Sequence, residues 1–141
     1  RQRQMCIRDR YTMMQVCREL DMTYQTLKFY CNEGLVPNVK RDKNNRRIFD
    51  EKDVKWIHDL SCLKKCGMSI QEMKEYLALC LEGESTIKAR KEMLDKKQKA
   101  LREEIAELEK SIDYIDWKQN FYNEIRSGAR PYVSNLIRTE E

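Results

Sequence analysis

The chain has 141 residues, of which 37% are charged and 40% hydrophobic, and its mean hydropathy is −0.85. This length fits one domain, or a small domain joined to an extended element, and the composition is too polar for a single compact core. Two Trp and seven Tyr argue against disorder, while only four Gly and two Pro favour long helices. We therefore expect a mainly α-helical protein with long, solvent-exposed helices.

The net charge of +4 is unevenly distributed along the chain. Residues 1–10 hold four Arg and one Asp, which supplies +3 and leaves +1 for residues 11–141. The total charge therefore does not predict a general attraction to nucleic acid, and a basic contact surface must be local. Residues 1–10 show no periodicity and no helix cap, so we expect a disordered or non-native extension.

The six cysteines suggest reduced thiols rather than disulfides. No stretch has the apolar centre of a signal peptide, and no apolar run approaches the roughly 20 residues of a membrane span. We therefore expect a cytoplasmic protein without a membrane partner. Three of these residues, Cys17, Cys31 and Cys80, are expected to pack in or near the core.

Two short helices are predicted near the start of the chain. Thr12 and Gln15 have the spacing of a capping box, which starts the first helix. Thr23 caps a second helix that runs to about Asn32, and Gly34 suits the left-handed position that ends it. Two helices joined by so short a turn are typical of a helix-turn-helix.

Residues 38–50, "NVKRDKNNRRIFD", predict a two-stranded hairpin, which we call the wing. Asparagine tolerates positive φ, so "KNN" suits the turn. Five of the eight residues 40–47 are basic and one is acidic. The wing is therefore the local basic surface of the chain.

Two further helices are expected between the wing and residue 82. Asp50 caps a helix to about Cys66, and Ser69 with Glu72 forms a second capping box that starts the next. We expect residues 11–82 to form a DNA-binding domain, residues 83–126 a coiled-coil dimerisation helix, and residues 127–141 a short C-terminal tail.

The dimerisation helix is predicted from a seven-residue repeat of apolar side chains. No Pro or Gly occurs in residues 85–126, and at 1.5 Å per residue such a helix is ~60 Å long. The apolar stripe, which we call the seam, cannot be buried by one helix alone, so we expect a homodimer. Polar ends and an apolar middle suit an antiparallel pair, although the sequence leaves the direction open. The expected interface residues are Ile87, Leu94, Leu101, Ile105, Leu108, Ile112, Ile115 and Tyr122.

With these elements in this order, the chain resembles MerR-family transcriptional regulators. The resemblance runs from Tyr11 to Ile125 and rests on "YTMMQVCRELDMTYQTLKFYCNEGLVP", "KRDKNNRRIFDEKDV" and "LKKCGMSIQEMKEYL". It implies an N-terminal winged helix-turn-helix followed by a long antiparallel coiled-coil helix. It also implies a homodimer that binds a pseudo-palindromic promoter with an over-long spacer, and that bends and untwists this DNA so that RNA polymerase can engage.

The expected DNA contacts lie on the second helix and the wing. Gln25 suits an adenine edge in the major groove, whereas Thr23 and Tyr30 suit phosphates. Lys28 stands where the family usually has Arg, and Asn45 where the wing usually has Gly, so base preference is expected to differ from the family pattern. The expected DNA-binding residues are Arg18, Thr23, Tyr24, Gln25, Lys28, Tyr30, Arg41, Lys43, Arg46 and Arg47.

A candidate effector site lies on the helix that starts at Asp50. His58, Cys62 and Cys66 follow at four-residue intervals, so the outer two lie ~12 Å apart along a helix. One tetrahedral ion does not bridge that distance, and we expect neither a metal site nor a cofactor. Cys62 points away from the buried arc of Trp56, Ile57, Leu60 and Leu63, and its stripe neighbours His58, Lys55 and Lys65 favour the reactive thiolate.

The segment "KWIHDLSCLKKCGMSI" also resembles the aldehyde- and electrophile-responsive branch of the family, in which Cys62 matches a characteristic thiol. This implies sensing through Cys62, with Cys66 and His58 as auxiliaries. Three alternatives remain. Cys62 is an inert structural residue, the protein is a regulator that senses a small ligand or a metal, or it is a coiled-coil interaction protein that does not bind DNA. An enzyme is not expected, because the chain has one His and no glycine-rich phosphate loop.

Overall fold

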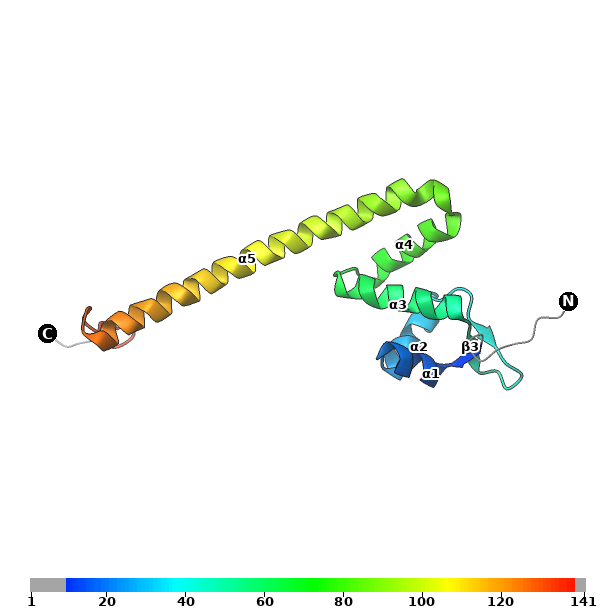
Figure 1. Ribbon diagram of the computed structural model, residues 1–141, viewed down its shortest axis with the longest axis horizontal. Coiled ribbons are helices and arrows are strands. Elements are labelled where there is room, and N and C mark those ends of the chain that lie inside the picture. Colours follow the sequence, from blue (N-terminus) through cyan, green and yellow to red (C-terminus); the bar gives the residue numbers. More distant parts are fainter. Residues whose placement is uncertain (1–9, 139–141) are drawn as a thin grey trace. The chain divides into compact units, whose positions relative to one another are not determined.

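The computed structural model describes residues 10–138, so the extension expected at residues 1–10 lies, apart from Arg10, outside the described residues. The protein is mainly helical, as its composition predicted, and it forms two compact units with a boundary between Gln98 and Lys99. Figure 1 follows the elements in chain order. The first unit holds the helix-turn-helix and the wing.

Helices α1 (Met13–Leu20) and α2 (Tyr24–Asn32) form the predicted helix-turn-helix. Thr12 accepts from the Gln15 amide at 3.2 Å, and the Gln15 side chain accepts from the Thr12 amide at 2.8 Å, so the predicted capping box is present. Thr23 caps α2 by accepting from the Thr26 amide at 3.1 Å. Asp21, in the left-handed region at φ 52°, makes the turn between the two helices.

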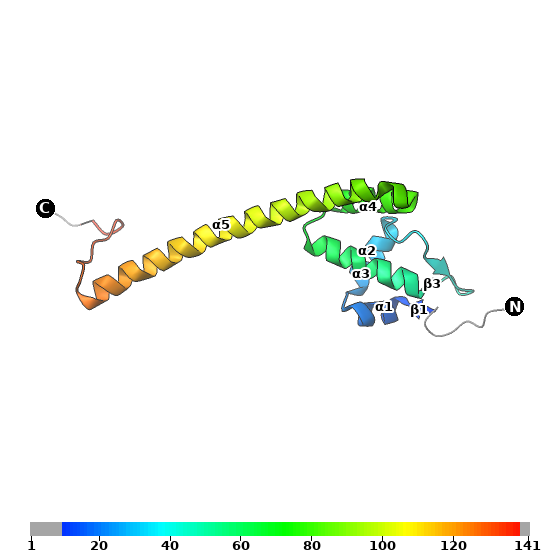
Figure 2. The same ribbon diagram turned by 45° about the horizontal axis from the view of Figure 1, so that its top comes forward.

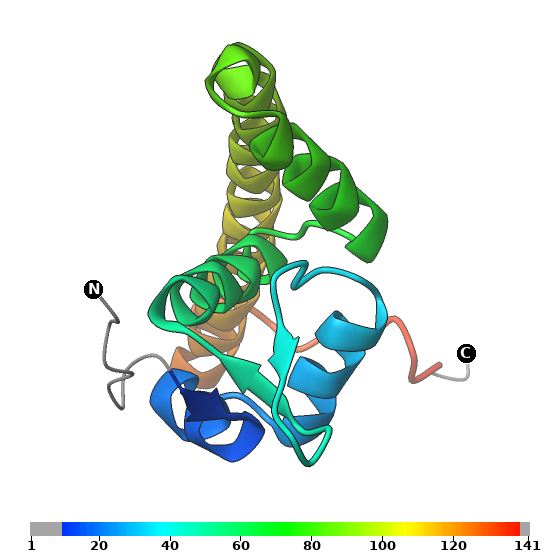
Figure 3. The ribbon, with the colours of Figure 1, turned by 90° about the vertical axis from the view of Figure 1, so that its right-hand side faces the viewer.

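The wing belongs to a sheet of three short strands, in the order β1–β3–β2. Strand β3 (Arg47–Phe49) pairs antiparallel with β2 (Lys40–Arg41), as the sequence predicted, and also with β1 (Tyr11–Thr12). The sequence did not predict β1, because two residues are too few to show an alternating pattern. Figure 3 shows the strands beside α1 and α2. The wing is therefore fixed to the start of α1.

Helices α3 (Glu51–Lys65) and α4 (Ile70–Glu82) follow the wing, and both start at predicted caps. Asp50 and Asp53 form a reciprocal capping box at α3, and Ser69 and Glu72 form one at α4. Trp56, expected in the buried arc of α3, is only half-buried, and its indole nitrogen donates to the Leu35 carbonyl at 2.7 Å. A polar group on the ring explains this position at the core edge.

The core of the first unit collects apolar side chains from all of these helices and from β3. Phe49, Leu27, Leu35, Ile57 and Leu60 are among its fully buried members. They come from the wing, from α2 and its following loop, and from α3. Wing and helix-turn-helix are therefore held against the same packed centre.

A short turn joins α4 to α5 (Ile87–Ser127) through the 3-10 helix η2 (Glu84–Thr86). Gly83 has φ 100° and ψ −158°, a conformation that side chains with a Cβ rarely adopt. Thr86, which is 6% exposed, donates to the Leu79 and Gly83 carbonyls. Arg90 donates to Thr86 Oγ1 at 2.9 Å and to the Gly83 carbonyl at 2.6 Å, so the reversal is fixed by hydrogen bonds.

Helix α4 runs beside the first part of α5, as Figure 2 shows. Lys97 of α5 reaches Glu72 at the start of α4. On the opposite side, Lys74 of α4 lies 2.9 Å from Glu33 at the end of α2. These ion pairs connect the start of α5 through α4 to the helix-turn-helix.

The second unit contains the remainder of α5 and the tail. None of the residues of α5 is buried. The apolar tail residues Tyr132, Val133, Leu136 and Ile137 are exposed as well. Among the described residues, no helix combines the length and apolar character that crossing a membrane requires.

Candidate nucleic-acid interface and thiol site

Helix α2 presents several of the expected DNA contacts to solvent. Tyr24, Gln25 and Lys28 are exposed, as is the cap residue Thr23. Tyr30, in contrast, is only 3% exposed, and burial raises the pKa of its hydroxyl. Its packing role is therefore seen in the structure, while its phosphate contact stays a prediction.

The wing keeps its shape through its own polar contacts. Asn45 takes φ 62° at the turn, the role expected for it in place of Gly. The Asp42 carboxylate accepts from the Asn44 and Arg46 amides at 2.9 Å, and these bonds, led by that of Arg46, hold the Asp42 pKa below its usual value. Arg41 donates to the Asn45 carbonyl at 2.9 Å. Hydrogen bonds within the wing therefore hold the backbone of its turn.

A hollow of about 550 Å³ lies between α1, α2 and the wing. Four of the expected DNA-binding residues line it: Tyr24, Arg41, Arg46 and Arg47. Arg47 also donates to Asn32 Oδ1 at 2.8 Å, which ties the wing to the end of α2. Arg18 lies apart from this group, in a hollow with Tyr11, Gln15 and Glu19.

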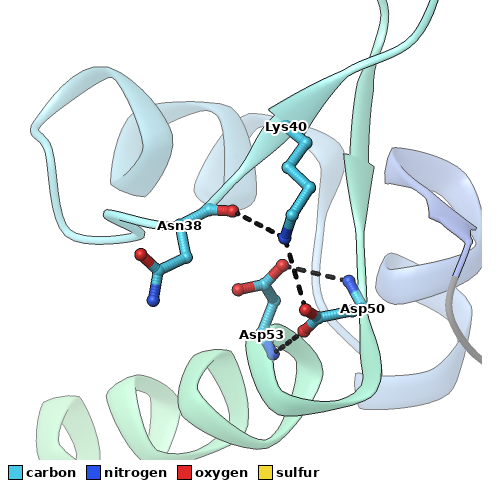
Figure 4. A network of polar contacts seen from close by, with 4 residues as sticks. All are labelled: Asn38, Lys40, Asp50 and Asp53. Carbon is cyan, nitrogen blue, oxygen red and sulfur yellow. Dashed lines mark hydrogen bonds and ion pairs between the residues drawn. The ribbon is translucent and has the colours of Figure 1, made fainter.

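A polar network at the base of the wing was not predicted from the sequence. Figure 4 shows Lys40 donating to the Asn38 carbonyl at 3.2 Å and to Asp50 Oδ2 at 3.3 Å, while Asp53 accepts from the Asp50 amide at 3.0 Å. Asp53 is 4% exposed, and burial raises its pKa. The hydrogen bond from the Asp53 amide, followed by Lys40, lowers the pKa of Asp50. The only sign of this network in the sequence is the three-residue spacing of Asp50 and Asp53, which is that of a helix cap.

The thiol of Cys62 is exposed on α3, on the side away from the buried arc, as predicted. Its Sγ lies 3.9 Å from His58 Nε2. Cys66 is half-buried at the end of the same helix. In the part of the chain that the structure describes, no three His, Cys, Asp or Glu side chains are grouped to hold a metal ion.

The remaining described cysteines are less accessible. Cys17 is buried, and Cys31 and Cys80 are half-buried. Burial raises the pKa of all three thiols, which favours the unreactive protonated form. Their environment fits the packing role expected for them.

Two family models match the chain: "MerR HTH family regulatory protein" over residues 11–80 and "MerR, DNA binding" over residues 55–117. An "Uncharacterized HTH-type transcriptional regulator" of Haemophilus influenzae is 34% identical over 131 residues, which cover 93% of this chain and 97% of that protein. The chain belongs to the MerR family. It is therefore a sequence-specific DNA-binding transcriptional regulator and not an enzyme, as the sequence predicted.

Solved structures and a further relative agree with membership of the MerR family. HiNmlR, a MerR family regulator lacking the sensor domain and bound to promoter DNA, is 34% identical with a TM-score of 0.69, over 84% of this chain and 94% of that one. A putative MerR family regulator from Listeria monocytogenes is 28% identical with a TM-score of 0.73, over 84% and 90%. The regulator AdhR of Bacillus subtilis is 40% identical over 88 residues, 62% of this chain and 63% of that protein.

The seam residues of this MerR-family chain remain accessible on α5. Leu101 is half-buried, and the other seven are exposed, with Leu108 at 63%. A group of aromatic side chains on α5, Tyr114, Trp117 and Phe121, was not predicted. The Tyr114 and Trp117 rings are tilted against each other with centroids 6.1 Å apart, and the Trp117 and Phe121 rings stack at 5.7 Å. The three residues are spaced three and four apart in the sequence, and this spacing could have predicted that they lie on one face of the helix.

Proposed function

We propose that the chain acts as a homodimer that binds a pseudo-palindromic promoter, distorts its over-long spacer for RNA polymerase, and responds to electrophiles through Cys62. The observation that carries this proposal is the exposed Cys62 thiol beside His58, in a DNA-binding regulator of the MerR family. Cys62 lies on α3, the helix that follows the wing directly. Cys62 lies in the last turn of α3, so a covalent change there acts on the helix that joins the wing to α4.

Dimerisation through α5 is supported by the exposure of its apolar seam. A run of exposed Leu and Ile side chains at a seven-residue spacing is the pattern that a partner helix covers. Each apolar square ångström removed from water contributes about 25 cal/mol, so association of two seams is favourable. The family resemblance supports the antiparallel direction.

The DNA-binding surface that we propose combines the exposed face of α2 with the wing. Tyr24 and Gln25 at the start of α2 enter the major groove, where Gln25 suits an adenine edge. Lys28, Arg41 and the other basic wing residues contact the flanking phosphates, which position the protein without reading sequence. Support comes from the exposure of Tyr24, Gln25, Lys28 and Arg41, and from the promoter DNA bound to the relative HiNmlR.

We propose spacer distortion because a dimer would carry two such surfaces at a fixed separation. Two reading helices at a fixed separation bind well only when the DNA between them bends or untwists to match. A change in α3 alters that separation, because α3 stands between the wing and the α4–α5 turn. The promoter elements are then aligned for RNA polymerase.

The test is transcription from a palindromic promoter fragment with wild-type protein and Cys62→Ser, each with and without formaldehyde. We expect formaldehyde to change transcription with the wild type and to have no effect with Cys62→Ser. Cys17→Ser, a buried thiol, is the matched control and is expected to respond as the wild type does. An unchanged response in Cys62→Ser would remove Cys62 from the mechanism.

A separate measurement tests the dimer. Leu108→Glu places a charge in the middle of the seam and is expected to sediment as a monomer with weakened binding to the palindrome. Leu136→Glu, an exposed tail position outside the seam, is the control. A dimeric Leu108→Glu protein would contradict the proposed interface.

A further inference from the structure

His58 and Cys62 form a pair of nucleophiles on the exposed face of α3. They are separated by one helical turn, and Cys62 Sγ lies 3.9 Å from His58 Nε2. Both side chains are exposed, while Ile57 and Leu60 on the other side of the helix are buried. His58 is the only histidine of the sequence. A small reagent that arrives from solvent therefore meets both groups together.

This pair is too small a ligand set for a structural metal site. A tetrahedral ion takes four ligands, and two residues one turn apart supply two. Within residues 10–138, no larger group of His, Cys, Asp and Glu surrounds the pair. A ligand that needs only two nucleophiles fits the geometry better than an ion does.

We infer that Cys62 and His58 together capture an aldehyde, whose carbonyl carbon becomes a covalent bridge between thiol and imidazole. This inference rests on the proposed electrophile response of Cys62 and adds His58 as a second covalent partner at the same site. An aldehyde carbon forms two new bonds in succession, whereas a simple alkylating agent forms one. The pair therefore distinguishes aldehydes from simple alkylating agents, because only an aldehyde carbon bonds to both Cys62 and His58.

The capture proceeds in two balanced steps, shown here for formaldehyde. First, the Cys62 sulfur adds to the carbonyl carbon, the carbon–oxygen double bond becomes single, and the thiol proton ends on oxygen. Next, His58 Nε2 attacks the same carbon with its lone pair, the carbon–oxygen bond breaks, and the oxygen leaves as water with the ring N–H proton. No oxidant or reductant takes part.

The starting geometry favours the second step. The side chains at positions i and i+4 of a helix are neighbours, so the hydroxymethyl group formed on Cys62 lies against the imidazole. Rotation of the exposed side chains about their χ angles brings sulfur and nitrogen to the shorter separation that one carbon spans. Because both groups are held on one helix, the second bond forms in an intramolecular step instead of a bimolecular one, which accelerates such condensations strongly.

The experiment treats the full chain with formaldehyde and measures the intact mass, followed by peptide mapping. We expect the wild type to gain the mass of one carbon atom, located between residues 58 and 62 and stable to dialysis. His58→Gln is expected to lose this stable gain and to show only the mass of one whole formaldehyde, removed by dialysis. Iodoacetamide, which forms one bond, is expected to label wild type and His58→Gln equally.

Two results would overturn the inference. A stable one-carbon gain in His58→Gln would show that another nucleophile closes the bridge, and its loss in Cys66→Ser would identify that nucleophile as Cys66. A wild type that carries only the dialysable adduct on Cys62 would exclude bridging. In either case, a promoter response that still depends on Cys62 would leave the proposed function standing, so the two failures are distinguishable.

Discussion

The ammonium group of Lys97 in α5 lies 3.0 Å from Glu72 Oε1 at the start of α4. The same nitrogen donates to the Gly67 carbonyl at 3.3 Å, in the turn that follows Cys66. The hydrogen bond from the Ser69 amide, followed by Lys97, lowers the pKa of Glu72. One lysine thus connects the proposed dimerisation helix to the end of the helix that carries Cys62.

Replacing Lys97 by Met is expected to lower the free energy of unfolding by about 1 kcal/mol or less, because the lost ion pair is partly exposed. The pKa of Glu72 is lower in the folded state, so its contribution is present above the unfolded pKa and is lost as pH falls through the folded one. Urea unfolding should therefore show a difference between the two proteins that shrinks in acid.

The control for Lys97 is Lys110→Met. Lys110 pairs with Glu107 within α5, where both side chains are more than 70% exposed, at 73% and 74%. This change should alter the free energy of unfolding by less than about 0.5 kcal/mol. Equal losses in both variants would mean that the contact of Lys97 with the α3–α4 turn adds no stability.

Substituting Gly83 by Ala is expected to destabilise the protein by about 1–3 kcal/mol through backbone strain. Gly83 has φ 100°, and a Cβ built there meets no neighbouring atom, so the strain comes from the backbone conformation and not from a clash. Thermal unfolding measures the loss. Glu82→Ala, at the exposed end of α4, is the control and should unfold close to the wild type.

Asp53→Asn is expected to leave the protein as stable as the wild type, or more stable, at neutral pH. Burial raises the folded-state pKa of Asp53, so its ionisation opposes folding as pH rises through the interval between the unfolded value, about 3.9, and the folded one. An Asn oxygen still accepts from the Asp50 amide. Below that interval both proteins are neutral at this position, and their unfolding free energies should converge.

Asp50→Asn is expected to change the stability at neutral pH in the opposite direction to Asp53→Asn. The folded-state pKa of Asp50 is lowered, so its carboxylate stabilises the protein above the unfolded pKa, and that stability is lost as pH falls. This variant should therefore be less stable than the wild type at neutral pH, with the gap closing in acid. Parallel pH profiles for the two Asn variants would contradict the assigned environments.

The sequence predicted the features that depend on neighbours within one turn. The caps at Thr12, Asp50 and Ser69, and the approach of His58 to Cys62, follow from spacings of three and four residues. Such contacts need no knowledge of the tertiary structure.

Side-chain contacts between different helices, and between side chains and distant backbone groups, were not predicted. The Lys97–Glu72 contact exists only because the α4–α5 turn sends α5 back along α4. The hydrogen bonds of Arg90 to the Gly83 carbonyl and the network around Lys40 likewise join groups whose approach is set by the path of the backbone. The candidate DNA surface was predicted as a set of residues, and the structure adds that Tyr24 and three wing arginines line one hollow.

Replacing Arg46 by Gln is expected to weaken promoter binding uniformly across sequences and to reduce the slope of log K against log salt concentration by about 1 per protomer. Arg46 is exposed in the wing and is proposed to contact phosphate, so its loss removes one counterion-release term. Gln25→Ala should instead relax sequence preference with little change in slope, because a base contact releases no counterion. Lys110→Gln, a cation of α5, is the control. Binding titrations at several salt concentrations, on the palindrome and on a scrambled fragment, separate these outcomes, and an unchanged slope for Arg46→Gln would exclude its phosphate contact.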